Sequence, residues 1–187
     1  MRASHSVLFD IRESVALLTI NRPEAMNALD PGVLTCLARQ LDRARADPRI
    51  AAVIVSGAGG KAFSSGADIK YLNAATPSAI HDFSRQAGAL ANRIETLGKI
   101  VVAAINGHAY GNGLELALSC ALRVAGRSSR FGHPDIRHGV VAGSVGISRL
   151  ARLVGRGRAT ELLLRGRILL AEEACQIGLI NAVVDDD

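Results

Sequence analysis

Short, mainly hydrophobic runs begin the chain, and a segment with a helical period follows them. The runs at residues 7–11 and 15–20 predict two strands joined by a short turn. Asp30 and Pro31 then predict a helix start, because aspartate suits the N-cap and proline suits the first helical position. Asp47 followed by proline predicts its end. The buried stripe of this helix is expected at Leu34, Leu37, Ala38 and Leu41.

The rest of the chain repeats short apolar runs followed by segments of helical period. The runs at residues 51–55 and 100–105 predict fully buried strands, and further strands are expected near 123–125 and 130–131. Helices are predicted over residues 79–96, 113–121, 145–153, 159–164 and 171–177. Alternation of strands and helices indicates an α/β fold with sheets covered by helices, in a single domain, residues 1–187.

Composition narrows the class of protein. The chain is 49% hydrophobic but only 3% aromatic, so the core is expected to be mostly aliphatic. No apolar run reaches the roughly 18 residues of a membrane helix, and the first residues do not lead into a signal peptide. Cys36, Cys120 and Cys175 are scattered, with neither metal-ligand spacing nor an even disulfide set. A protein of the reducing cytoplasm is expected, without a membrane partner or a bound metal.

The net charge of +5 is carried mainly by arginine. A basic surface can bind nucleic acid, attract a polyphosphorylated ligand, or simply be solvated. The chain has few aromatic side chains for stacking on bases and no nucleic-acid-binding motif, so nucleic acid is not expected as a partner. Lys61 and Lys70 are candidates for phosphate contacts or for plain surface positions.

Two glycine-rich turns carry the candidate chemistry, at residues 63–69 and 106–116. Glycine before a helix lets main-chain N–H groups point into a cavity, which is how proteins build oxyanion holes. A thioester carbonyl that becomes an enolate needs two such donors. With acids at Glu115 and Asp135, the pattern indicates chemistry next to an activated carbonyl.

The order and spacing of several short motifs resemble the crotonase, or enoyl-CoA hydratase/isomerase, superfamily over residues 15–184. The motifs are residues 20–23, 27–29, 62–68, 106–115, 131–135 and 178–180. The resemblance implies β-β-α units wound into a spiral. It also implies an acyl-CoA thioester substrate, no cofactor beyond the coenzyme A of that substrate, and a homotrimer or hexamer. Relatives have a further C-terminal helical segment that caps the acyl pocket and supports trimers, and this chain is expected to lack it.

The resemblance also implies roles for individual residues. The main-chain N–H groups of Ala67 and Asn112 are expected to form the oxyanion hole. Glu115 is expected to activate water and Asp135 to protonate the α-carbon. The implied substrate-binding positions are Met26, Ala28, Ser65, Gly66, Asp68, Ile69, Gly111, Gly113 and Pro134. The related dienoyl isomerases carry a further acid near position 143, where this chain has glycine.

Several alternatives stay open. Glu115 can instead be an exposed charge near a helix N-terminus, and Asp135 can simply cap a turn. Asn112 stands where most relatives have glycine. It is expected to tolerate left-handed backbone but to crowd the thioester, so glycine there is expected to preserve or raise turnover. His108, His133 and His138 have no metal spacing and are expected to be structural or superficial, with His133 near the site. The predicted activity is hydration of a 2-enoyl-CoA; enoyl isomerisation and non-catalytic CoA binding are the alternatives.

Overall fold

The computed structural model describes residues 6–139 and 144–186, in which ten strands form two sheets. The larger sheet contains, in spatial order, β1 (Val7–Arg12), β2 (Val15–Ile20), β3 (Ala52–Gly57), β5 (Ile100–Ile105), β7 (Leu122–Gly126) and β10 (Ala182–Val184). The smaller sheet contains β4 (Ala62–Ser64), β6 (His108–Tyr110), β8 (Arg130–Gly132) and β9 (Ile168–Leu170).

From β3 to β8, successive strands alternate between the two sheets. Each of the pairs β3/β4, β5/β6 and β7/β8 gives its first strand to the larger sheet and its second to the smaller sheet, and helical segments follow. Neighbouring strands are parallel, except that β1 is antiparallel to β2 and β9 to β8. This β-β-α winding confirms the predicted α/β class and explains how distant turns come to lie side by side.

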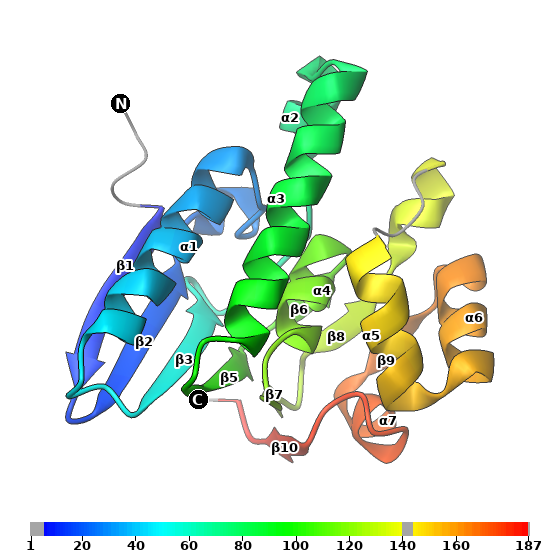
Figure 1. Ribbon diagram of the computed structural model, residues 1–187. Coiled ribbons are helices and arrows are strands. Elements are labelled where there is room, and N and C mark those ends of the chain that lie inside the picture. The colour runs from blue at the N-terminus through cyan, green and yellow to red at the C-terminus, as the bar shows by residue number, and fades with distance from the viewer. Residues whose placement is uncertain (1–5, 140–143, 187) are drawn as a thin grey trace.

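The helices cover the larger sheet and surround the junction between the sheets. Their bounds are α1 (Pro31–Ala46), α2 (Ile69–Ala74), α3 (Pro77–Glu95), α4 (Asn112–Leu118), α5 (Ser144–Val154), α6 (Arg156–Arg165) and α7 (Ala171–Gln176), with short 3-10 helices η1 (Pro23–Ala25) and η2 (Pro134–His138). Figure 1 shows α1 and the long α3 side by side, and α4 packs against α3, α5, β4 and β6. Among these helices, none combines the length and apolarity needed to span a membrane.

The local signals located α1 accurately. The Asp30 carboxylate accepts a hydrogen bond from the amide of Val33 at 2.8 Å, and this confirms the predicted N-cap. The predicted stripe residues Leu34, Leu37 and Leu41 are buried. Burial of this stripe against the sheet and α3 stabilises a helix that would be marginal in isolation.

The prediction that β3 and β5 are fully buried was wrong. In both strands, buried residues alternate with more exposed ones, and 57% of the surface of Ile100 is accessible. One face of the sheet carries the core, whereas the other is only partly covered, so apolar runs here do not mean burial on both faces. Four of the five three-residue strands in the described part of the chain, β4, β6, β9 and β10, were not predicted, because three residues give a weak pattern; only β8 was expected, near residues 130–131.

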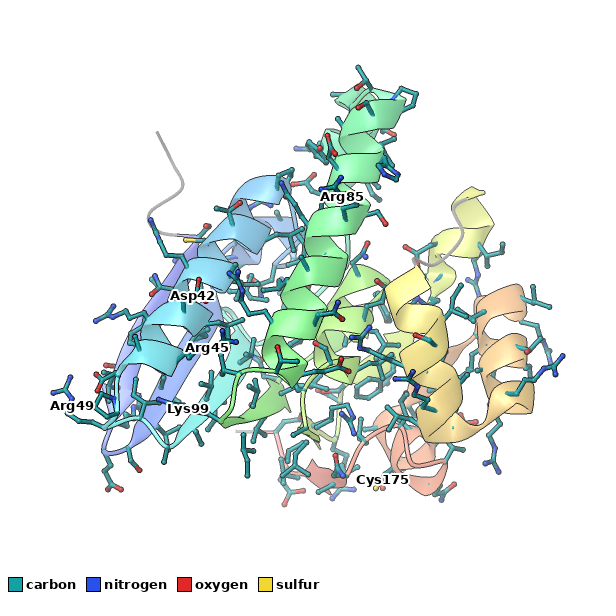
Figure 2. The ribbon with its side chains drawn as sticks, in the orientation of Figure 1. Asp42, Arg45, Arg49, Arg85, Lys99 and Cys175 are labelled. Atoms are coloured by element: carbon teal, nitrogen blue, oxygen red, sulfur yellow. The ribbon has the colours of Figure 1, made fainter. Side chains whose placement is uncertain are left out.

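The C-terminal end of α1 shows how part of the positive charge is used. In Figure 2, Arg45, Arg49 and Lys99 lie around this end of the helix. The Lys99 ammonium group donates to the carbonyl oxygens of Ala44 and Asp47, both at 2.6 Å. Hydrogen bonds from Arg49 lower the pKa of the Asp47 carboxyl to about 2. Lys99 thus satisfies carbonyl groups left free at the end of the helix, and positive charge at a helix C-terminus interacts favourably with the helix dipole, so these cations stabilise the fold.

Candidate active site

A buried asparagine fixes the loop that enters the site. Asn27 is 1% exposed and has a left-handed backbone, with φ of 55°. Its side-chain amide donates to the carbonyl oxygens of Ala58 (2.9 Å) and Ala62 (2.7 Å), and its oxygen accepts from the Arg22 amide at 3.0 Å. Three satisfied hydrogen bonds offset the cost of burying the polar group and of the backbone conformation.

Arg22 ties this loop to the first glycine turn. Its guanidinium donates to the carbonyl oxygen of Ala28 (2.8 Å) and to the carboxylate of Asp68 (2.9 Å), and lies 3.2 Å from the carboxylate of Asp30. Asp68 also caps α2. Although burial opposes its ionisation, the hydrogen bonds from Arg22 and from the amides at the start of α2 lower the pKa of Asp68. The pair holds the segment around Ala67 in place.

The two glycine turns contact each other directly. Gly66 has φ of 101°, and a Cβ there would lie 2.9 Å from the carbonyl oxygen of Tyr110 and 3.4 Å from the amide nitrogen of Asn112. A Cβ on Gly113 would lie 2.7 Å from the Cβ of Ser64. Neither position has room for a side chain. The glycines therefore allow the main chain before α2 and the main chain at the start of α4 to approach closely.

Two amides at this junction are available as donors. Ala67 pairs with Leu29 as an isolated bridge, in which the amides of Leu29 and Asp68 make the hydrogen bonds. Asn112 is the first residue of α4, where helix geometry supplies no acceptor. Within the described residues, the N–H groups of Ala67 and Asn112 have no hydrogen-bond acceptor. Two unpaired main-chain donors therefore lie at this junction, and paired donors of this kind are the groups from which oxyanion holes are built.

Glu115 lies inside the protein one helical turn into α4. It is 4% exposed, which excludes the alternative of an exposed helix charge. Its carboxylate accepts a hydrogen bond from the side-chain amide of Asn112 at 2.8 Å. On the other side, a Cβ on Gly146 of α5 would lie 2.6 Å from the Glu115 carboxyl carbon. The carboxylate is therefore held between its own helix and α5.

Asn112 differs from expectation in two ways. Its backbone is helical, and the left-handed conformation at this turn belongs to Gly111, with φ of 47°. Its side chain is directed to the carboxylate of Glu115. The tolerance of asparagine for left-handed backbone is thus not needed here.

Asp135 lies against Gly111, the residue that precedes the helix of Glu115. It is in the first turn of η2, and a Cβ on Gly111 would lie 2.6 and 2.9 Å from its two carboxylate oxygens. The ring of His133, 2% exposed, has its Nδ1 atom 3.8 Å from Oδ2 of Asp135. Burial lowers the pKa of His133, and the nearby Asp135 only partly opposes this. The imidazole is therefore neutral at pH 7 and leaves the carboxyl without a charged partner there.

A narrow cavity separates the helices next to Glu115. Its volume is about 10 Å³, which is room for about one water molecule. Of the residues that line it, Asn112 and Glu115 are polar. The apolar lining consists of Leu29, Leu34, Ala87, Leu90, Ala91 and Leu116. The site thus combines two free amides, two carboxyl groups and a small apolar space.

Comparison with known proteins identifies the family of the chain. Residues 10–187 match the enoyl-CoA hydratase/isomerase family. The chain belongs to that family. It is 39% identical to a short-chain-enoyl-CoA hydratase of Clostridium acetobutylicum, over 97% of this chain and 69% of the relative. It is 37% identical to a crotonyl-CoA hydratase of Syntrophomonas wolfei, over 99% of this chain and 71% of the relative.

Solved structures of the family show the same fold. An enoyl-CoA hydratase from Thermoplasma volcanium superposes with a TM-score of 0.93 at 37% identity, covering 98% of this chain and 73% of that chain. An enoyl-CoA hydratase from Bacillus anthracis superposes with a TM-score of 0.93 at 34% identity, covering 96% of this chain and 70% of that chain. The resemblance drawn from the sequence motifs is confirmed.

The other predicted substrate-binding positions lie around the paired loop and the turns. The Ser65 amide donates to the Met26 carbonyl at 2.9 Å, which aligns the segment 26–29 with 65–68. Ile69 is 62% exposed at the start of α2, and Pro134 is the first residue of η2. The full set in this region is Met26, Ala28, Ser65, Gly66, Asp68, Ile69, Gly111, Gly113 and Pro134.

The predictions for the two lysines and the three histidines have different outcomes. Lys61 and Lys70 are exposed. His108 is half-buried and stacks on Tyr110 with ring centroids 5.3 Å apart, as fits a structural role. A surface position for His133 is wrong, because it is buried beside Asp135. Position 143 and the side chain at position 138 lie outside the described residues.

Two residues near the site were not assigned a role from the sequence: Arg22 and Gly146. Arg22 lies within a family motif, so its position was a usable signal. Gly146 lies inside the helical pattern of α5 and carries no local signal. Its contact with Glu115 depends on how α5 packs, and α5 is fixed to α3 by Arg149, which donates to the Glu95 carboxylate at 2.8 and 2.6 Å.

Proposed function

We propose that this chain is an enoyl-CoA hydratase that adds water in the syn sense across the double bond of a 2-enoyl-CoA thioester. The observation that carries the proposal is the pair of acids on either side of one turn. The carboxyl group of Asp135 lies against Gly111, and that of Glu115 is bonded to the side chain of Asn112. Relatives named as hydratases at 37–39% identity support it.

The amides of Ala67 and Asn112 bind the thioester oxygen in this proposal. When water adds to the β-carbon, negative charge moves onto that oxygen and the thioester becomes an enolate. Donors fixed by the backbone need no reorganisation as the charge develops, and each is worth about 3 kcal/mol in the transition state. Because Gly66 and Gly113 have no side chains, the two turns lie close together, and this close approach sets the separation of the two donors.

The two carboxyl groups divide the proton transfers. Glu115 takes a proton from the attacking water, and the Asp135 carboxyl delivers a proton to the α-carbon as the enolate collapses. Aspartate is one methylene shorter than the glutamate usual in hydratases, a difference of about 1.5 Å. Glycine at position 111 lets the shorter side chain lie directly against the turn. These steps use side chains and amides alone, so no cofactor other than the substrate's coenzyme A is proposed.

We propose a short acyl chain for the substrate, because two of the relatives are named for short-chain and crotonyl substrates. The cavity beside Glu115, with a volume of about 10 Å³, has room for the attacking water. We further propose that the reaction takes place in the cytoplasm, where the free thiols of Cys36, Cys120 and Cys175 are compatible with a reducing medium.

The test is the conversion of crotonyl-CoA by the purified chain, followed by loss of the ultraviolet absorbance of the conjugated thioester and by identification of the product. We expect 3-hydroxybutanoyl-CoA. Asp135→Asn is expected to reduce hydration about a hundredfold, because a general acid contributes at least that factor. Asp82→Asn, on the exposed surface of α3, is the matched control and should leave hydration unchanged.

The outcomes separate the candidate activities. Hydration needs both acids, whereas isomerisation of a 3-enoyl-CoA needs one, and a CoA-binding protein needs neither. A wild-type chain that isomerises but does not hydrate would favour the isomerase. Binding of crotonyl-CoA without turnover would overturn the enzymatic proposal altogether.

Gly146→Ala is expected to reduce hydration roughly ten- to a hundredfold, because the added methyl group would displace the Glu115 carboxyl group from its place. Overpacking should also destabilise the fold by about 1–3 kcal/mol, although alanine is normally better than glycine in a helix. The control is Gly157→Ala in α6, where a Cβ would meet nothing within 4 Å. Equal melting temperatures and rates for the two variants would contradict the close contact.

The assembly is proposed to be a homotrimer, or a pair of trimers. Large apolar side chains are exposed on strands of both sheets, where they would favour association. They include Ile100 (57% exposed), Leu122 (44%), Leu170 (52%) and Val184 (48%). Sedimentation equilibrium at micromolar concentration should give three or six times the mass of 19.6 kDa. A single species of 19.6 kDa that hydrates crotonyl-CoA normally would refute this part of the proposal.

A further inference from the structure

One residue connects the oxyanion hole to the proposed base. Asn112 and Glu115 are three residues apart on α4, a spacing that places their side chains on the same side of a helix. The side-chain amide nitrogen of Asn112 donates to Oε2 of Glu115 at 2.8 Å. The main-chain N–H of the same asparagine is one of the two free donors at the junction of the turns.

We propose that the Asn112 side chain is a positioning residue for Glu115: it keeps the carboxylate ionised and aimed at the water, and couples it to the amide that holds the thioester oxygen. The inference rests on the proposed function. A glycine at this position would supply the N–H alone, so the second role belongs to the asparagine side chain.

The surroundings of Glu115 make such a donor valuable. The carboxylate is 4% exposed, and a buried charge is costly unless hydrogen bonds favour it. Apart from Asn112, the residues that line the cavity with it are apolar, and Gly146 of α5 lies against its carboxyl group. The apolar lining consists of Leu29, Leu34 of α1, Ala87, Leu90 and Ala91 of α3, and Leu116 of α4. A hydrogen bond to the charged form is correspondingly stronger than one at the surface.

The geometry also predicts which kinetic constant depends on the side chain. Asn112 reaches the carboxylate through its side chain and would reach the substrate oxygen through its main chain. Loss of the side chain leaves the N–H in place, so substrate binding should be nearly unaffected. The chemical step should suffer, because the carboxylate loses both a donor that favours its charged form and a restraint on its orientation.

The experiment compares Asn112→Ala, Asn112→Asp and wild type on crotonyl-CoA across pH. For Asn112→Ala we expect kcat to fall about tenfold with KM changed less than about threefold, the effect of one hydrogen bond to a charged group. The acidic limb of the kcat/KM profile should move to higher pH by about one unit. Asn112→Asp has the same shape but opposes Glu115 with a second carboxylate, so its limb should move further. Asn73→Ala, on the exposed surface of α2, is the control for loss of an asparagine side chain.

A double-mutant cycle separates this inference from the proposed function. If Asn112 acts through Glu115, Asn112→Ala should cost about tenfold in the wild-type background and nothing further in Glu115→Gln. A full tenfold loss in both backgrounds, or an unshifted acidic limb, would overturn the positioning role while leaving Glu115 as the base. If Glu115→Gln itself hydrates at the wild-type rate, the proposed function fails instead. Matching circular dichroism and melting temperatures show that the variants are folded.

Discussion

Replacing Glu115 by glutamine should leave a folded protein that still binds crotonyl-CoA but hydrates it two to four orders of magnitude more slowly, the usual contribution of a general base. The amide of glutamine fills the same space and can still accept the hydrogen bond from Asn112, so packing against Gly146 should survive. The measurement is kcat by loss of enoyl absorbance, with Kd for crotonyl-CoA determined separately by calorimetry.

Glu161→Gln is the matched control for this result. Glu161 lies on α6, where its carboxylate forms an exposed pair with Arg165 at 2.9 Å. Such surface pairs contribute little to stability, so the control should keep wild-type kinetics and a nearly unchanged melting temperature. Wild-type-like turnover in purified Glu115→Gln would remove Glu115 from the mechanism.

Asn112→Pro should reduce hydration by about two to three orders of magnitude relative to Asn112→Ala. Both variants lose the side chain, but only proline also removes the main-chain N–H proposed to hold the enolate oxygen, and loss of such a donor has this effect. The fold should tolerate proline, because Asn112 is the first residue of α4 and the preceding Gly111 has a non-helical backbone.

The comparison of proline with alanine therefore isolates one hydrogen bond. Circular dichroism and thermal melting of both variants check that α4 is intact, and the ratio of their kcat values gives the contribution of the N–H. Equal rates in the two folded variants would show that this amide is not a donor to the substrate.

Local signals in the sequence were enough to predict the elements whose ends are marked by capping residues, proline or glycine. Asp30 and Pro31 fixed the start of α1, and the glycine turns indicated where free amides would occur. The pairing of the turns followed from resemblance, because nothing in residues 63–69 alone says that they lie against residues 106–116. Gly66 and Gly113 make that approach possible, but only the alternation of strands between two sheets brings it about.

The site details that escaped prediction depend on side chains meeting across elements. The sequence suggested that Asn112 would crowd the thioester and that glycine would be neutral or better there. The hydrogen bond to Glu115 gives the opposite expectation, a loss of rate. The role of Gly146 likewise becomes visible only when α5 is packed beside Glu115. Periodicity places such residues on an element but does not reveal what lies opposite them.

The contact between Gly111 and Asp135 also constrains how the enzyme can change over evolutionary time. The carboxylate oxygens of Asp135 lie 2.6 and 2.9 Å from where a Cβ at position 111 would be, so any side chain at position 111 collides with the acid. Mutational paths through position 111 are therefore closed until position 135 has moved, whereas paths that begin at position 135 remain open. The absence of a Cβ at Gly111 therefore determines the order in which the two positions can be substituted, and not only which residues are allowed there.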